Sequence, residues 1–205
     1  MFSRLFARQL ASPTGPAAGL LGRIWNRRNA ALNDAALRAL ALVPDDRVLE
    51  VGFGGGYLLG RMARQVSAGF LAGVDISPAI LARGIRRFHA LVAAGRLELR
   101  CAPAEELPFS AGRFSKACSV NSFFYWANVP RAFAELARVL KPGGLLVLCF
   151  TRGRCLEDRS FARHGVRCYD EADVRRLLER AGFHDIDAFP GADRHRDFVC
   201  LTARC

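Results

Sequence analysis

A short apolar strand followed at once by a glycine-rich turn constrains the fold of this chain more than any other feature. The strand covers Val48 to Val51, and Gly52, Gly54 and Gly56 follow it at every second position. Glycine allows a sharp backbone turn and lets a ligand approach where a Cβ would collide. Residues from Tyr57 to Val66 then take helical periodicity, so the turn leads into a helix N-terminus that favours an anionic ligand group. The stretch predicts a nucleotide-binding strand–turn–helix unit.

The spacing of the glycines separates the two cofactor classes that use such a unit. The dinucleotide fingerprint G-x-G-x-x-G requires a glycine at position 57, which is Tyr57 here. The chain reads Glu50-x-Gly52-x-Gly54-x-Gly56 instead, which resembles the first motif of class I S-adenosylmethionine-dependent methyltransferases. The resemblance implies that the loop wraps the methionine part of this cofactor, with Glu50 supporting it and Tyr57 in contact. A purely structural glycine turn is the alternative.

A second expected strand, Phe70 to Asp75, ends in an acid 23 residues beyond Gly52. A carboxylate at this place accepts hydrogen bonds from the ribose hydroxyls of a nucleotide. Asp75 therefore matches the second motif of the family, and the resemblance assigns Ile76 to the cofactor as well. The alternative role of Asp75 is to cap a helix, although Ser77-Pro78 already supplies a cap and a first turn.

The loop after the third expected strand carries a third resemblance. Residues 102–109 are similar to the family segment Gly-Asp-Ala-x-x-Leu-Pro-Phe, which faces the adenine. The resemblance implies that the Ala104 backbone and Glu105 hold the ring. Pro103 stands where the family has Asp, so one contact to the adenine amino group is missing. Residues 138–144, Arg-Val-Leu-Lys-Pro-Gly-Gly before an apolar strand, match the family again.

These features predict an α/β fold with a Rossmann-like seven-stranded sheet and helices on both faces. The last two strands are close enough in sequence to pair as an antiparallel hairpin, which dehydrogenases lack, and the resemblance implies the strand order 3-2-1-4-5-7-6. We expect one methyltransferase domain over residues 1–205, with an N-terminal helical cap at 1–43 and a cofactor-binding core at 47–205. The expected helices cover 26–42, 57–66, 78–94 and 170–181, and residues 136–140 belong to a further helix that ends at 141–144. The expected strands cover 48–51, 70–75, 96–101, 114–120, 145–150, 183–189 and 197–202.

Polar and aromatic residues cluster after the fourth expected strand, at 121–126. Ligands of open parallel sheets bind at the carboxyl ends of the strands. Asn121 and Tyr125 are therefore candidate catalytic residues, with Asn121 also touching the cofactor, although Tyr125 and Trp126 fit a core role equally well. His164, after the fifth strand, is a candidate base, but a lone loop histidine is more often simply exposed.

The residues after the fourth strand also restrict the methyl acceptor. Amino-directed DNA enzymes carry Asn/Asp-Pro-Pro-aromatic there, whereas this chain has Asn121-Ser122-Phe123-Phe124. The chain contains no Pro-Cys nucleophile of the cytosine-C5 type. We therefore expect a small, partly apolar acceptor: a metabolite, a quinone or a lipid-like molecule. An RNA methyltransferase and a non-catalytic S-adenosylmethionine-binding module are the alternatives; aminopropyl transfer would need acidic residues after the fourth strand.

The formal charge of +11 first suggests an anionic partner. Of the 30 basic residues, however, only Lys116 and Lys141 are lysines, and the arginines are spread along the chain. This pattern favours a genomic composition bias over a nucleic-acid surface. Residues 1–33 contain no acid and begin with an amphipathic pattern. We expect this segment to cover the acceptor pocket; peripheral membrane contact and a transit peptide are alternatives, and the oligomeric state is open.

The seven cysteines form no C-x-x-C pair and no metal-ligand spacing, so no metal site is expected. Cys101, Cys118, Cys149 and Cys200 lie in apolar strand-like runs, where a thiol acts as a small hydrophobe. This usage predicts a reducing cytoplasm. The longest clean apolar run, Leu145 to Phe150, is too short to span a bilayer.

Overall fold

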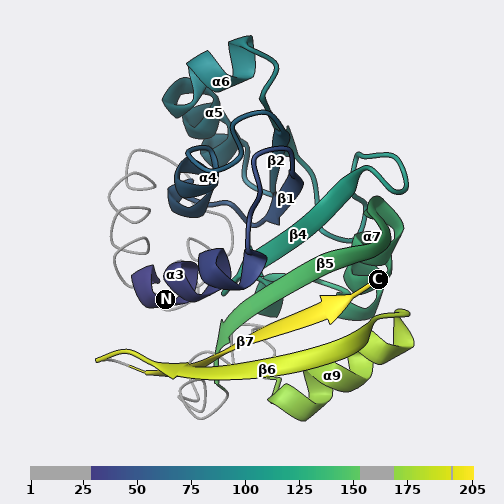
Figure 1. Ribbon diagram of the computed structural model, residues 1–205. Helices are drawn as coiled ribbons and strands as arrows, with labels where there is room; N and C mark the ends of the chain where they lie inside the picture. Colours follow the sequence, from purple (N-terminus) through teal and green to yellow (C-terminus); the bar gives the residue numbers. More distant parts are fainter. Residues whose placement is uncertain (1–28, 153–168, 195) are drawn as a thin grey trace, which may run out of the picture.

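The computed structural model describes residues 29–152, 169–194 and 196–205. Within these ranges seven strands form one sheet in the order β3-β2-β1-β4-β5-β7-β6, which confirms the expected order (Figure 1). Neighbouring strands from β3 to β5 are parallel, whereas β7 runs antiparallel to β5 and β6, so the expected hairpin is confirmed. None of the helices in these ranges is long and apolar enough to cross a membrane.

The elements are α3 (Ala30–Leu40), β1 (Arg47–Val51), α4 (Tyr57–Met62), β2 (Phe70–Asp75), α5 (Pro78–Arg87), α6 (His89–Ala93), β3 (Leu97–Cys101), β4 (Phe114–Val120), the 3₁₀ turn η1 (Phe123–Tyr125), α7 (Val129–Val139), β5 (Leu140–Thr151), α9 (Glu171–Arg180), β6 (His184–Ala192) and β7 (Asp197–Arg204).

The central strands are buried on both faces, and their side chains alternate between two apolar clusters. On β5, Leu146, Leu148 and Phe150 join the cluster that includes α7 and α9. Val147 and Cys149 join the other cluster, which includes α3 and α4. Helices therefore cover both faces of the sheet (Figure 1). This two-sided burial explains why the strand appears in the sequence as a continuous apolar run.

The helix expected over residues 78–94 is divided at Phe88 into α5 and α6. Phe88 leaves helical geometry with φ −111° and ψ 24°, while its N–H still bonds to the Gly84 carbonyl. Its ring packs where a Cβ on Gly56 would lie. The division of the helix at Phe88 therefore coincides with contact between Phe88 and the glycine loop. No glycine or proline at this position signals the division in the sequence.

Helix α7 begins at Val129 and includes residues 136–139, which were expected to be helical, although sequence reasoning assigned no start to this helix. Asn128 is its N-cap, because the side chain accepts the Arg131 N–H at 3.1 Å, and Pro130 follows within the first turn. These are ordinary start signals, and sequence reasoning overlooked them. Strand β5 then begins at Leu140 rather than 145, with a shift in its pairing to β4 across the Pro-Gly-Gly segment.

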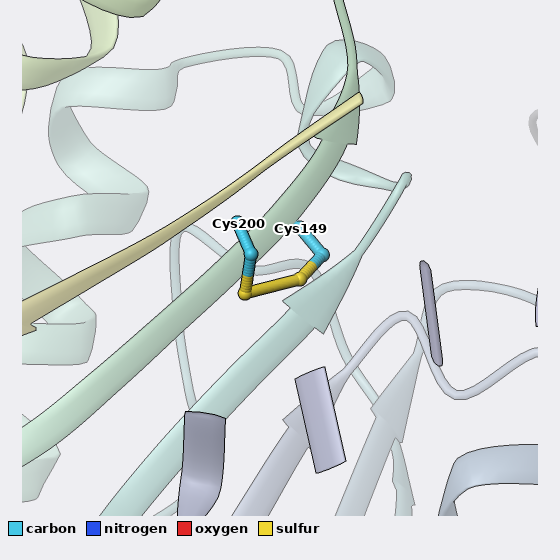
Figure 2. The surroundings of a disulfide bond; sticks show 2 residues. All are labelled: Cys149 and Cys200. Carbon is cyan, nitrogen blue, oxygen red and sulfur yellow. A yellow bond between two sulfur atoms is a disulfide. The ribbon is translucent and has the colours of Figure 1, made fainter. Parts of the chain in front are cut away.

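The prediction that Cys149 and Cys200 are buried thiols is wrong, because a disulfide bond joins them (Figure 2). The two residues lie directly opposite each other in the antiparallel register of β5 and β7, with Cα atoms 4.1 Å apart. The pairing depends on this register and on a sequence separation of 51 residues, so no local pattern indicates it. Cys118 is buried and free, as expected, whereas Cys101 is exposed.

Candidate active site

The carboxyl ends of the parallel strands meet at one edge of the sheet. Strand β1 ends beside the glycine loop, β2 ends at Asp75, β4 leads into Asn121 and β5 ends at Thr151. Because β1 lies between β2 and β4 and β5 follows β4, these residues form a row along the edge. Ligands bind at such an edge in open α/β sheets.

The three glycines of the loop serve different purposes. Gly52, Gly54 and Gly56 all have positive φ, at 81°, 49° and 69°. A Cβ on Gly52 would collide with the Ser122 side chain, and one on Gly56 would lie 2.6 Å from the Phe88 ring. Among the described residues, a Cβ on Gly54 would meet nothing closer than the Gly52 carbonyl oxygen at 4.0 Å. Gly54 therefore faces open space, and it is the position where a ligand can approach the backbone.

Neighbouring elements hold the glycine loop in place. The Gly52 N–H donates to the Val74 carbonyl at 2.8 Å, which anchors the loop to β2. The Gly54 N–H donates to Asp75 Oδ2 at 3.0 Å. From α5, the Arg87 guanidinium donates to the Gly55 carbonyl. The loop is thus shaped by residues of β2 and α5 before any ligand binds.

Asp75 connects the glycine loop to the start of α5, and its ribose role stays a prediction. Its Oδ2 holds Gly54, and its Oδ1 accepts the Ser77 N–H at 3.0 Å at the start of α5. Ser77 itself caps that helix, because its hydroxyl accepts the Ile80 N–H. Burial raises the pKa of Asp75, and the two backbone bonds lower it in part. Each carboxylate oxygen retains a lone pair, so the geometry leaves Asp75 able to accept ribose hydroxyls.

Glu50 is a buried acid with one unpaired oxygen. Its side chain is 4% exposed, and a backbone hydrogen bond from Leu59 reaches the carboxyl group. Among the described residues, Oε2 has no hydrogen-bond partner. Burial raises the pKa of Glu50 well above its usual range, and the nearby Asp75 raises it further. Two carboxyl groups at one loop disfavour a pyrophosphate and fit a ligand that carries positive charge, such as S-adenosylmethionine.

The residues expected at the adenine take different positions. Ile76 is 58% exposed beside Asp75, so its apolar side chain is open to a ligand. Ala104 is buried. The Glu105 carboxylate accepts the Asn128 N–H at 2.8 Å, so it lies against the N-terminus of α7. The carboxylate is therefore engaged in holding the loop, and its contact with adenine stays a prediction.

Asn121 has a left-handed backbone, with φ 53°. Its N–H donates to the Cys149 carbonyl at 2.8 Å, and its Oδ1 accepts the Thr151 N–H at 3.2 Å. Its Nδ2 lies 3.5 Å from Asn29 Oδ1, just before α3. A non-glycine residue with positive φ persists only where the surroundings impose it, and such residues cluster at functional sites. Asn121 thus joins β4, β5 and the start of α3.

The aromatic residues after β4 divide between core and surface. Phe123 and Phe124 are buried and stacked, with ring centroids 4.4 Å apart. Trp126 is half-buried and packs edge-on against Phe133. Tyr125 is 37% exposed, and burial of the rest of its side chain raises the pKa of its hydroxyl. Of these four residues, Tyr125 is the one accessible to an acceptor.

Sequence reasoning placed Tyr57 in the pocket, and the structure places it at the first position of α4. The Arg61 guanidinium lies over its ring and also pairs with Asp34 of α3. Tyr57 therefore takes part in the contact between α4 and α3 next to the glycine loop.

Two predictions concern segments that the structure does not describe. The candidate base His164 and the N-terminal segment up to residue 28 both lie outside the described residues. Within the described parts of the chain, no group of three His, Cys, Asp or Glu side chains is arranged to hold a metal ion.

Sequence reasoning missed Ser122, which joins the ends of β1 and β4. Its hydroxyl donates to the Val51 carbonyl at 3.1 Å and lies 2.7 Å from the Ser119 hydroxyl. It also fills the space that a side chain at Gly52 would need. The signal was a small polar residue two positions after β4, the strand that pairs with β1.

The sheet order, the terminal hairpin and the loop at Gly54 together define the class I methyltransferase fold. Comparison with known proteins agrees: a family model described as a methyltransferase domain matches residues 49–148. The 2-phytyl-1,4-naphtoquinone methyltransferase of Trichormus variabilis is 30% identical over 84% of this chain and 72% of its own length. The chain therefore belongs to the class I S-adenosylmethionine-dependent methyltransferases, and it is an enzyme of that family.

Two further relatives extend this result. The uncharacterized methyltransferase YdaC of Bacillus subtilis is 29% identical over 90% of this chain and 97% of its own length. The ubiquinone/menaquinone biosynthesis C-methyltransferase UbiE of Geotalea daltonii is 32% identical over 62% of this chain. The match spans 52% of that enzyme, so this chain corresponds to about half of it.

Solved structures of low sequence identity show the fold alone. A methyltransferase from Aquifex aeolicus aligns with a TM-score of 0.69 at 18% identity, over 98% of this chain and 97% of that one. The [4+2]-cyclase SpnF aligns with a TM-score of 0.74 at 24% identity, over 88% and 82%. Because a cyclase shares this fold, the acceptor and its chemistry must be argued from the site.

Proposed function

We propose that this enzyme methylates a small, partly apolar ring compound that carries hydroxyl groups, such as a reduced quinone. The observation that carries the proposal is the composition of the edge beyond β4. There Tyr125 exposes an uncharged phenol ring, and the half-buried Asn121 carries an uncharged carboxamide. Two relatives whose names refer to quinones, the C-methyltransferase UbiE and the naphtoquinone methyltransferase, support the same class of acceptor.

The cofactor side of the proposal rests on the fit of four residues. S-adenosylmethionine supplies an activated methyl group on a positively charged sulfur when it is bound. Gly54 leaves open space at the loop, Asp75 has acceptor capacity for the ribose, and the unpaired oxygen of Glu50 suits a positively charged group. The exposed Ile76 side chain offers an apolar surface to the adenine.

The acceptor side of the proposal requires positioning more than acid–base chemistry. A raised pKa keeps the Tyr125 hydroxyl protonated, so it donates a hydrogen bond and does not act as a base. Cys118 is buried and its pKa is raised well above the usual range, so it does not act as a nucleophile. Holding the acceptor in line with the methyl group is then the main contribution of the protein, and correct placement alone accounts for large rate effects.

The test is a transfer assay with labelled S-adenosylmethionine and 1,4-dihydroxynaphthalene, kept reduced and free of air. We expect cofactor binding by calorimetry and label in the extracted naphthalene product. Cofactor binding with label in added total RNA, and none in the naphthalene, would favour the RNA methyltransferase. Binding without transfer to the naphthalene, to RNA or to a host extract would favour a non-catalytic module.

A further inference from the structure

Thr151, the last residue of β5, carries a buried hydroxyl that no described residue pairs with. The residue is 4% exposed, and its Oγ1 has no hydrogen-bond partner among the described residues. Its backbone N–H, by contrast, is paired with Asn121 Oδ1. Buried polar groups are nearly always hydrogen-bonded, so an unpaired one at a ligand-binding edge is a place where a polar atom of a ligand fits.

The polar groups around Thr151 are already engaged with one another. Asn29 Oδ1 accepts from Arg196 Nη2 at 2.6 Å and faces Asn121 Nδ2 at 3.5 Å. Asn121 in turn holds the Thr151 backbone. These bonds connect the start of α3, the hairpin of β6 and β7, and the ends of β4 and β5. They hold Thr151 in position and leave its hydroxyl available.

The place of Thr151 in the sheet favours the acceptor over the cofactor. The residues that fit the cofactor come from β1 and β2 and from the loops that follow them. Thr151 lies on β5, on the far side of β4 from those strands. An acceptor that approaches beyond the end of β4 would therefore meet it. A threonine hydroxyl both donates and accepts, and, being neutral, it suits a phenol or carbonyl oxygen.

We propose that Thr151 is a specificity-determining residue whose hydroxyl forms a hydrogen bond to an oxygen atom of the methyl acceptor. This inference rests on the proposed function and narrows it. The acceptor carries a hydroxyl or carbonyl oxygen that is held at β5, while Tyr125 contacts its ring. A purely aliphatic acceptor would leave the hydroxyl of Thr151 unpaired in the complex.

The experiment compares Thr151→Val, which keeps the shape and removes the hydroxyl, with Thr151→Ser, which keeps the hydroxyl. The probe is reduced 1,4-dihydroxynaphthalene, and Thr202→Val on β7 is the control. We expect Thr151→Val to lower kcat/KM for the probe by about three- to tenfold, as for one uncharged hydrogen bond, and Thr151→Ser to retain more of it. The dissociation constant of S-adenosylhomocysteine should not change in Thr151→Val, and its melting temperature should not fall.

Each of the other possible results contradicts either the contact between Thr151 and the acceptor or the proposed function. If kcat/KM for the probe is unchanged in Thr151→Val, the contact is rejected. If the affinity for S-adenosylhomocysteine falls as much as kcat/KM does, Thr151 contacts the cofactor instead. If Thr151→Val and Thr151→Ser both melt at a lower temperature and lose kcat/KM equally, Thr151 has a packing role instead. If the parent protein binds S-adenosylhomocysteine but does not methylate the probe, the inference fails and the methyltransferase assignment stands. If the parent does not bind S-adenosylhomocysteine at all, the proposed function itself fails.

Discussion

Arg138 donates from its guanidinium to the Phe109 carbonyl oxygen at 2.7 Å, which joins helix α7 to the loop expected to face adenine. The same side chain reaches the Leu107 carbonyl at 3.0 Å and pairs with Glu135. Glu135 in turn accepts the Leu107 N–H at 2.8 Å. The shape of the loop therefore depends on two side chains of α7 that sequence reasoning did not select.

Arg138→Gln should loosen this loop and weaken S-adenosylhomocysteine binding by about three- to tenfold. Hydrogen bonds to a charged group contribute roughly 1.5–3 kcal/mol each, and partial exposure of Arg138 places its contribution to stability at the lower end. Calorimetry and thermal melting measure the two effects. Arg180→Gln, at an exposed position of α9, is the control. Unchanged affinity in a destabilised Arg138 variant would limit Arg138 to a structural role.

Glu50 should make stability depend on pH. Its raised pKa means that the folded protein keeps a proton that the unfolded chain releases above about pH 4.3. Its contribution to the free energy of unfolding is thus full below that pH and is lost as pH rises toward the folded pKa, at roughly 1.4 kcal/mol per pH unit. Glu50→Gln stays neutral, so its melting temperature relative to the parent should increase from pH 5 to pH 8.

The exposed Glu179→Gln on α9 serves as the control for that substitution. A difference between Glu50→Gln and the parent that does not vary with pH would show that Glu50 is ionised in the folded protein.

Gly54→Ala should reduce cofactor affinity at least tenfold, because the added methyl group enters the open space at the loop. Gly95→Ala is a matched control, since Gly95 also has positive φ (66°) and nothing within 4 Å of an added Cβ. Both variants should lose roughly 1–2 kcal/mol of stability from left-handed strain. Calorimetry with S-adenosylhomocysteine then separates them. If Gly54→Ala and Gly95→Ala bind S-adenosylhomocysteine with equal affinity, the loop at Gly54 does not bind the cofactor.

The sequence predicted those helices and strands that depend on interactions between residues close together in the chain. The apolar run ending at Asp75 and the cap at Ser77 both agree with the structure, as β2 and the start of α5. Apart from the start of α7, the features that were missed join distant segments. Arg138 reaches the loop at Phe109, and Thr151 is placed by Asn121. Such contacts require the register of the sheet, which no single segment encodes.

The disulfide between Cys149 and Cys200 gives a prediction about thiol content. Alkylation in denaturant without a reductant should label Cys118 and leave Cys149 and Cys200 unlabelled, as peptide mass spectrometry can check. Cys200→Ala should cost roughly 2–5 kcal/mol of stability, more than Cys118→Ala, which breaks no crosslink. Complete labelling of all three residues in freshly isolated protein would agree with the reducing compartment predicted from the cysteine pattern instead.

Substitution of Tyr125 distinguishes between a role in holding the acceptor and a role in the apolar core. Because it is 37% exposed, Tyr125→Ala should change the melting temperature little and leave S-adenosylhomocysteine affinity unaltered. Turnover of reduced 1,4-dihydroxynaphthalene should fall strongly, since a misplacement of about 1 Å can reduce the rate ~100-fold. Trp126→Ala is the contrasting variant: it removes a partly buried ring packed against Phe133, so stability should fall by up to about 3–5 kcal/mol and all activities together. If Tyr125→Ala instead follows the pattern of Trp126→Ala, Tyr125 belongs to the core and the acceptor is held elsewhere along the edge.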